Sequence, residues 1–103
     1  MTESTRVEKA SLPAEGHGVR VVANGKPVAV FRVGGQLYAI DARCSHVGGP
    51  LDRGAVAGTQ VTCPLHGSVF DVRDGSVVRG PAATPVTAYR AHLEGETLVL
   101  ERD

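Results

Sequence analysis

Two short motifs in this 103-residue chain each place a histidine close behind a cysteine. The first motif is C-x-H, formed by Cys44 and His46, and the second is C-x-x-H, formed by Cys63 and His66. The chain has only two cysteines and four histidines, so both pairings would arise by chance in about one or two of a thousand sequences. Thiolates and imidazoles are both metal ligands, and the four residues therefore predict a metal centre.

Two thiolates and two imidazoles suit more than one kind of metal centre. A single zinc ion accepts this ligand set in a tetrahedral site. Zinc modules usually pair ligands of one kind at short spacing, however, whereas each motif of this chain mixes the two kinds. Mixing is expected if two iron atoms are present, with the thiolates on one iron and the imidazoles on the other. A zinc-stabilised interaction module is the alternative.

Both motifs lie in stretches rich in glycine and proline, between segments that predict short β-strands. Asn-Gly at 24–25 and Gly-Gly at 34–35 separate three strand-like runs, which predicts a meander before the first motif. Asp-Gly at 74–75 predicts a hairpin after the second motif, and residues 86–101 predict a closing one. Residues 41–58 break the strand pattern and predict a long, ordered loop.

The predicted fold class is all-β, with about nine or ten short antiparallel strands in small sheets. The whole chain, residues 1–103, is expected to be one domain. Its metal-binding part covers about residues 41–85 and is formed by two loops, for which Leu51 and Val56 are candidate anchors.

Composition excludes several classes of function. Eleven basic and eleven acidic residues give a formal net charge of zero, which argues against a nucleic-acid-binding protein. No run of about 18 apolar residues is present, so no membrane span is predicted. The first ten residues are polar and lack a signal sequence, which predicts a cytoplasmic protein with reduced thiols.

The chain also lacks the parts that a redox enzyme needs. Oxygen activation needs a separate iron site of two histidines and a carboxylate. Besides the two motif histidines the chain has only His17 and His92, and no additional domain is expected that could hold such a site. The sequence contains no G-x-G-x-x-G fingerprint and no flavin-sized domain. We therefore predict an electron-transfer protein and not an enzyme.

The two motifs and their flanking segments, CSHVGGPL and CPLHGSVFDVRDGSVVRGPAATPV, resemble the Rieske family. The resemblance extends over about residues 18–101, nearly the whole chain. It implies a Rieske-like fold and a [2Fe–2S] cluster bound by two cysteines and two histidines. On this resemblance the ligands are Cys44, His46, Cys63 and His66.

Residues next to the ligands are expected to surround the cluster. The backbone can approach the cluster sulfurs closely where there is no side chain, at Gly48, Gly49 and Gly67. Within the family, a serine at the position of Ser68 donates its hydroxyl to a cluster sulfide. A third loop with a proline, here Pro81, helps to enclose the cluster.

Departures from the family pattern indicate which kind of Rieske protein this is. The chain has neither the second cysteine pair nor the N-terminal membrane anchor of the Rieske proteins of cytochrome complexes. Phe70 replaces a tyrosine of the high-potential members, which predicts a potential in the lower half of the range of about −150 to +300 mV. The chain therefore resembles the soluble Rieske-type ferredoxins associated with oxygenases.

That resemblance implies a one-electron carrier between a flavin-dependent ferredoxin reductase and a terminal oxygenase or similar redox enzyme. We expect a monomer that docks transiently through the end of the molecule that carries the cluster. A small Rieske subunit of a larger oxidoreductase, of nitrite or arsenite type, is the alternative. The expected docking residues are His46, His66, Leu51, Pro64 and Leu65, with Pro81 extending their apolar rim.

Overall fold

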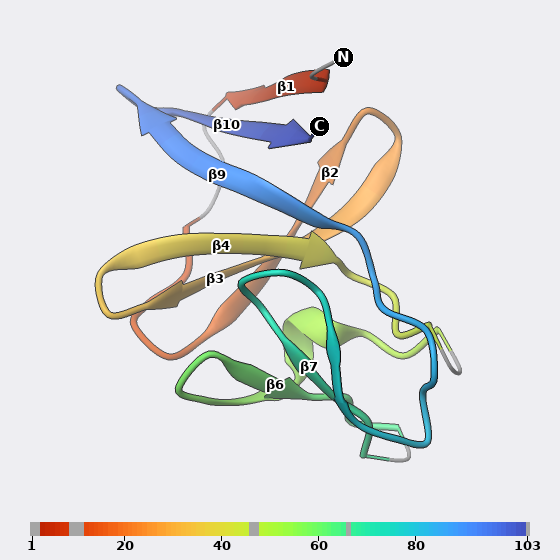
Figure 1. The fold of residues 1–103 in the computed structure, drawn as a ribbon. Coiled ribbons are helices and arrows are strands. Elements are labelled where there is room, and N and C mark those ends of the chain that lie inside the picture. Colours follow the sequence, from red (N-terminus) through yellow and green to blue (C-terminus); the bar gives the residue numbers. More distant parts are fainter. Residues whose placement is uncertain (1–2, 9–11, 46–47, 66, 103) are drawn as a thin grey trace.

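The computed structural model describes residues 3–8, 12–45, 48–65 and 67–102 (Figure 1). These residues form ten strands and one short 3-10 helix, which confirms the predicted all-β class. In this part of the chain no helix is long and apolar enough to cross a membrane. The elements are β1 (Glu3–Glu8), β2 (Gly18–Ala23), β3 (Lys26–Val33), β4 (Gln36–Asp41), η1 (Leu51–Arg53), β5 (Ala55–Ala57), β6 (Gln60–Thr62), β7 (Val69–Asp71), β8 (Val77–Arg79), β9 (Ala88–Glu94) and β10 (Thr97–Arg102).

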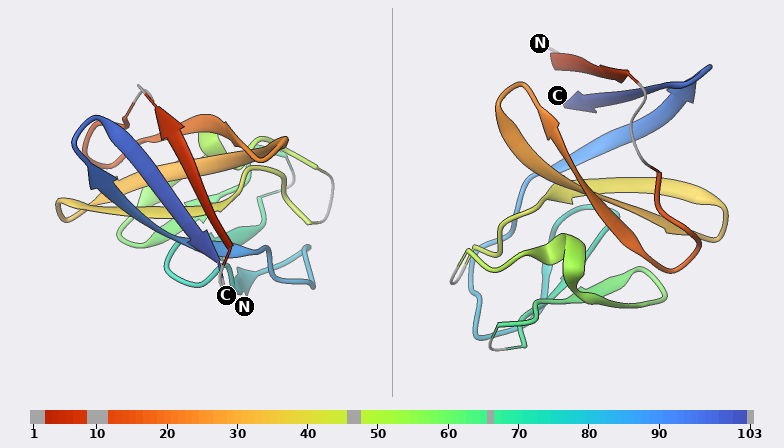
Figure 2. Two further views of the ribbon diagram at one scale, coloured as in Figure 1. Left: turned by 90° about the horizontal axis from the view of Figure 1, so that it is seen from above. Right: turned by 180° about the vertical axis from the view of Figure 1, so that it is seen from behind.

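The larger sheet has six strands in the order β1-β10-β9-β4-β3-β2, and every neighbouring pair is antiparallel. The β2–β3 turn uses Asn24 and Gly25 at φ of 52° and 77°, the left-handed values that a type I′ hairpin requires. The edge strands β1 and β2 approach each other, so the sheet curls back on itself. Pairing of Glu3 with Arg102 places the two ends of the described chain side by side (Figure 2).

Strand β3 is buried on both faces because it lies between two cores. Val28 and Val30 point into the curled sheet, where they join a cluster that we call the aliphatic core. Ala29 and Phe31 point the other way, into a cluster that we call the intersheet core. The division follows from the alternation of side chains along a strand.

The smaller sheet has four strands in the order β5-β6-β7-β8, each of three residues. It lies against the large sheet below β3 and β4 (Figure 1). Leu51, Val61 and Phe70 fill the intersheet core from this side, against Phe31 and Ile40 of the large sheet. Both cysteines also belong to the intersheet core.

Two parts of the fold differ from the sequence-based expectation. Strand β1 was not expected, because its sequence ESTRVE is mostly polar; it forms by pairing with β10 over six residue pairs. The long loop predicted for residues 41–58 contains helix η1 and strand β5. Leu51 anchors this segment as expected, and its side chain is fully buried.

Candidate metal centre

The loop that carries the predicted ligand Cys44, which we call the first ligand loop, leaves the end of β4. Backbone hydrogen bonds hold it on both sides of Cys44. The Ala42 N–H donates to the Pro27 carbonyl at 3.1 Å, and the Ala42 carbonyl accepts from the Leu51 N–H at 2.7 Å. The Cys44 N–H donates to the Gly49 carbonyl at 2.9 Å. The loop is therefore anchored to the large sheet at its start and to η1 at its end.

The second ligand loop joins β6 to β7 at one end of the small sheet. Its first residue, Cys63, donates its N–H to the Ser68 carbonyl at 2.7 Å, which closes the loop. Gly67 has a φ of 76°, a left-handed conformation that glycine adopts without strain. The closing bond directly follows the pairing of Thr62 in β6 with Val69 in β7, so the small sheet sets the position of Cys63.

The thiols of Cys44 and Cys63 lie against each other in the intersheet core. Their residues are 3% and 1% exposed, and neither forms a disulfide. Burial raises the pKa of the Cys63 thiol and the neighbouring Cys44 raises it further, while the Leu65 N–H acts in the opposite direction. Two adjacent thiolates in an apolar core require a cation to neutralise them. The pair therefore either stays protonated or binds a metal.

Gly49 leaves space beside the second cysteine. A Cβ atom at this position would lie 2.7 Å from the Cys63 sulfur and 3.3 Å from Cγ and Cδ1 of Leu65. The backbone of the first loop thus packs directly on the sulfur of the second loop. Paired thiols and a surface without a side chain next to them fit a metal cluster held between the two loops.

A third loop, residues 80–85, is connected to both ligand loops. The fully buried Ser68 hydroxyl accepts a hydrogen bond from the Ala82 N–H at 2.9 Å. The Ser45 hydroxyl, within the first motif, donates to the Thr84 carbonyl. Within the described part of the chain, Ser68 Oγ only accepts, so its own proton can be donated to an acceptor in the site.

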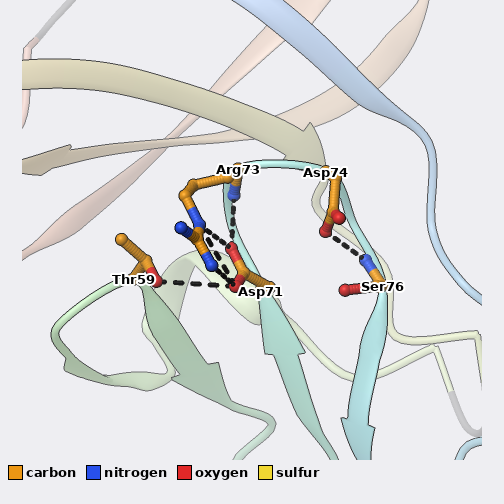
Figure 3. A network of polar contacts seen from close by, with 5 residues as sticks. All are labelled: Thr59, Asp71, Arg73, Asp74 and Ser76. Carbon is orange, nitrogen blue, oxygen red and sulfur yellow. Dashed lines mark hydrogen bonds and ion pairs between the residues drawn. The ribbon is translucent and has the colours of Figure 1, made fainter.

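A polar network supports the β7–β8 hairpin that leads into the third loop (Figure 3). Asp71 accepts from the Arg73 backbone N–H at 2.9 Å and from its guanidinium at 2.8 Å, and Thr59 donates to it at 3.5 Å. The Arg73 guanidinium holds the pKa of the Asp71 carboxyl below its usual value. Asp74 accepts from the Ser76 N–H at 3.0 Å, which shapes the turn.

The structure brings together the predicted site residues that it describes. The two cysteines meet, and the other described residues lie in the three loops around them: Gly48, Gly49, Gly67, Ser68 and Pro81. The predicted ligands His46 and His66 lie outside the described residues. Their role stays a prediction.

The predicted apolar rim is wrong at one position. Leu51 is 0% exposed, because η1 turns its side chain into the intersheet core, and it is not accessible to a partner. Pro64 and Pro81 are exposed, and Leu65 is 47% exposed. These three residues are accessible for docking.

Sequence analysis missed two residues that organise the site. Ser45 contacts Thr84, 39 residues away, and no motif spacing connects them. Asp71 had a local signal, because an Asp-x-Arg segment directly precedes the Asp-Gly turn of the predicted hairpin. In such a segment the aspartate and the arginine are close enough to form an ion pair with each other.

The family of the chain follows from comparison with known proteins. Residues 4–90 match the model of the Rieske [2Fe-2S] domain. The chain is 35% identical over 88 residues to the 3-phenylpropionate/cinnamic acid dioxygenase ferredoxin subunit of Shigella boydii, covering 84% of this chain and 82% of that protein. This chain belongs to the Rieske [2Fe-2S] domain family.

Further relatives are similar over nearly their full lengths. The ferredoxin component of the naphthalene 1,2-dioxygenase/salicylate 5-hydroxylase systems of Ralstonia sp is 33% identical, over 86% of each chain. The ferredoxin of carbazole 1,9a-dioxygenase from Nocardioides aromaticivorans IC177 superposes with a TM-score of 0.85 at 34% identity, over 93% of this chain and 96% of that one.

Two other solved structures bear on the partners of such proteins. One is a complex of reduced oxygenase and oxidized ferredoxin in carbazole 1,9a-dioxygenase, with a TM-score of 0.80, 30% identity and coverage of 92% and 98%. The other is a putative NADH-dependent nitrite reductase small subunit from Mycobacterium tuberculosis, with a TM-score of 0.81, 25% identity and coverage of 100% and 97%.

The protein is therefore a Rieske-type ferredoxin, an electron carrier rather than a catalytic enzyme. Its cofactor is a Rieske-type [2Fe–2S] cluster, and its partners are redox proteins. The predictions of family, cofactor and electron transfer are confirmed.

Proposed function

We propose that this ferredoxin accepts single electrons from a flavin-dependent reductase and delivers them to a terminal oxygenase. The observation that carries the proposal is the pair of buried thiols, Cys44 and Cys63, brought together from two loops at one end of the molecule. Relatives in dioxygenase systems support the choice of the oxygenase as acceptor. We place the protein in the cytoplasm as a monomer.

The proposed ligands are Cys44 and Cys63 on one iron and His46 and His66 on the other. When bound, the cluster supplies reversible one-electron transfer. The thiols are buried, so the protein around them excludes water from the sulfur side of the site. Ser68 is placed to donate its free hydroxyl proton toward the site, since its oxygen is already held by Ala82.

The exposed residues of the ligand loops suit transient docking. Pro64, Leu65 and Pro81 are exposed apolar residues in two of the three loops that meet at this end of the molecule. Small interfaces with few apolar contacts are typical of electron-transfer encounters, which must also dissociate quickly. We propose that electrons enter and leave there.

The ligand assignment is tested by substitution and spectroscopy of the purified protein. His46→Ala and His66→Ala are each expected to abolish the Rieske absorption and EPR spectra and to reduce bound iron and acid-labile sulfide. His17→Ala and His92→Ala are the matched controls and should keep both spectra. An unchanged spectrum in His46→Ala, or its loss in His92→Ala, would contradict the assignment.

A small subunit of a nitrite reductase is the second candidate, favoured by the full-length similarity to the Mycobacterium tuberculosis chain. A carrier and a subunit differ in how tightly they associate. Size-exclusion chromatography of the native protein from its own cells separates them, because a subunit elutes with a large partner and a carrier elutes alone. The large partner, if found, is identified by whether it reduces nitrite.

A further inference from the structure

The net charge of zero hides an uneven distribution of charge over the surface. Three shallow hollows are lined by five of the eleven basic residues but by only two acidic ones, Asp41 and Glu101. The rest of the chain consequently holds six basic and nine acidic residues. We call the five basic residues the basic band: Lys26, Arg43, Arg73, Arg90 and Arg102.

The three hollows adjoin one another because they share residues. Lys26 lines one hollow together with Arg43 and the next together with Arg102. Arg102 then lines the third hollow together with Arg73 and Arg90. The band is thus continuous, although its five members come from five different strands or loops.

Three of the five basic residues of the band are not neutralised by a carboxylate of the residues that the structure describes. In the described part of the chain, no carboxylate forms an ion pair with Lys26, Arg43 or Arg102. Arg73 does pair with Asp71, so it contributes less. Asp41, the acid between Lys26 and Arg43, accepts a hydrogen bond from the Tyr89 hydroxyl at 2.7 Å and is only partly exposed.

The band begins at the metal centre. Arg43 directly precedes Cys44, and it shares its hollow with the start of β3. The hydrogen bond from the Ala42 N–H to the Pro27 carbonyl fixes that start of β3 against the first ligand loop. A partner that covers the band therefore also reaches the end of the molecule through which we propose that electrons pass.

We propose that the basic band is a docking surface for an acidic face of a redox partner protein. The inference rests on the proposed function and adds the chemistry of the partner to it. Opposite charges on the two surfaces would guide the encounter and align the cluster end with the partner. Ion pairs that stay exposed to solvent are weak, so the complex would still dissociate quickly. A neutral chain can thus bind selectively through charge.

The location of the surface can be mapped with a redox-inert paramagnetic anion, hexacyanochromate(III). Added to the ¹⁵N-labelled ferredoxin, it should broaden backbone amide signals along the band, around Lys26 and Arg102. Signals around Arg53 and Arg6, two basic residues outside the band, should change little. Equal broadening at all basic residues, or broadening centred on Arg53, would overturn the proposal. This readout requires no electron transfer.

Docking of an acidic protein is tested with a reduced plant-type [2Fe–2S] ferredoxin, an acidic carrier whose potential lies below the Rieske range. One electron passes from this probe to the oxidised ferredoxin, without bond cleavage or proton transfer. Stopped-flow measurement should give a second-order rate constant that decreases as salt is added. A rate constant that salt leaves unchanged or increases would overturn the proposal.

Charge-reversal variants test whether the residues mapped by the anion also determine the rate constant of electron transfer. Arg43→Glu and Lys26→Glu should each lower the rate constant at low salt by roughly three- to tenfold. Arg53→Glu, with the same change in net charge at an exposed site outside the band, is the matched control and should change it much less. An equal decrease in all variants would show that only net charge matters and would overturn the proposal. Arg102→Glu substitutes for any variant that fails to assemble.

Two outcomes separate this inference from the proposed function. A wild-type protein with a Rieske spectrum but no preference for the anion at the band would refute the docking surface alone. Binding of a labelled DNA duplex at physiological salt, abolished by Lys26→Glu, would assign the band to nucleic acid and would also refute it.

Discussion

The two cores of this protein differ in composition and in the strands that enclose them. The aliphatic core contains only valine, alanine and leucine among its buried members, and it lies inside a sheet whose strands are six to eight residues long. The intersheet core contains Phe31, Phe70 and both cysteines, and the sheet on one side of it has strands of three residues.

The two regions are consequently stabilised in different ways. Long ladders and aliphatic packing stabilise the large sheet without help from a cofactor. Three-residue strands form few ladder bonds, so the small sheet depends more on Phe70, on the Asp71–Arg73 network and on the metal centre. The large sheet is therefore a rigid base, and the region around the cysteines is the part whose order is coupled to the cluster.

The largest effect is expected from Cys63→Ser, which should abolish the Rieske spectrum. Hydrogen exchange should then accelerate by about 100-fold or more at β6 and β7, while β3 and β10 keep their protection. Exchange measured by mass spectrometry on the variant and the wild type tests this. Equal acceleration in both sheets would show that the two regions unfold as one unit.

Truncating one large side chain in each core tests whether the stability of the fold and the binding of the cluster depend on different regions. Leu98→Ala, in the aliphatic core, should lower the free energy of unfolding by about 2–5 kcal/mol and leave the spectrum intact. Phe70→Ala, in the intersheet core, should cost about 3–5 kcal/mol and also reduce cluster content. Urea titration and iron analysis measure both quantities. Val22→Ala, at an exposed site, is the control, and a spectrum lost in Leu98→Ala would contradict the separation.

A smaller effect is expected from Gly49→Ala, because its Cβ would lie 2.7 Å from the Cys63 sulfur. Overpacking of about 1–3 kcal/mol should speed the loss of iron to a chelator. Gly48→Ala is the matched control: it meets no atom within 4 Å but has a φ of 70°, so it carries only backbone strain of about 1–2 kcal/mol. Iron loss that is as fast in Gly48→Ala would indicate that backbone strain, and not contact with sulfur, is decisive.

The smallest effect concerns the Asp71–Arg73 pair, which holds the pKa of Asp71 below its usual value. Stability from a lowered carboxyl pKa is fully present above the unfolded-state pKa of about 3.9 and is lost as pH falls through the folded-state value. Asp71→Asn should therefore lower the free energy of unfolding by about 1–2 kcal/mol at pH 7. The difference in this free energy between the variant and the wild type should decrease below about pH 4. Urea titrations between these pH values measure the difference.

The exposed Arg6–Glu94 pair of the large sheet provides the comparison. Glu94→Gln should have a smaller effect than Asp71→Asn at every pH, because solvent screens the exposed pair. A larger effect of Glu94→Gln would contradict the view that the small sheet depends more on its polar contacts.

Prediction from the sequence succeeded where the signal is local. Asn24-Gly25 specified its hairpin because few residues adopt left-handed φ at adjacent positions. The cysteine and histidine spacing indicated the family for the same reason, since each predicted pair of ligands lies within one short stretch of sequence. Strand β1 was missed because its polar sequence has no pattern of its own and pairs with β10, at the other end of the chain.

By itself, the sequence determined most of the turns and the class of protein, because these depend on residues that are neighbours along the chain. Only the tertiary structure decided that Leu51 faces the intersheet core, and that Ser45 contacts Thr84. It also decided that Lys26, Arg43 and Arg102 line adjoining hollows. The physical reason is that burial and surface charge depend on how strands distant in sequence pack, and a net charge of zero contains no information about where the charges meet.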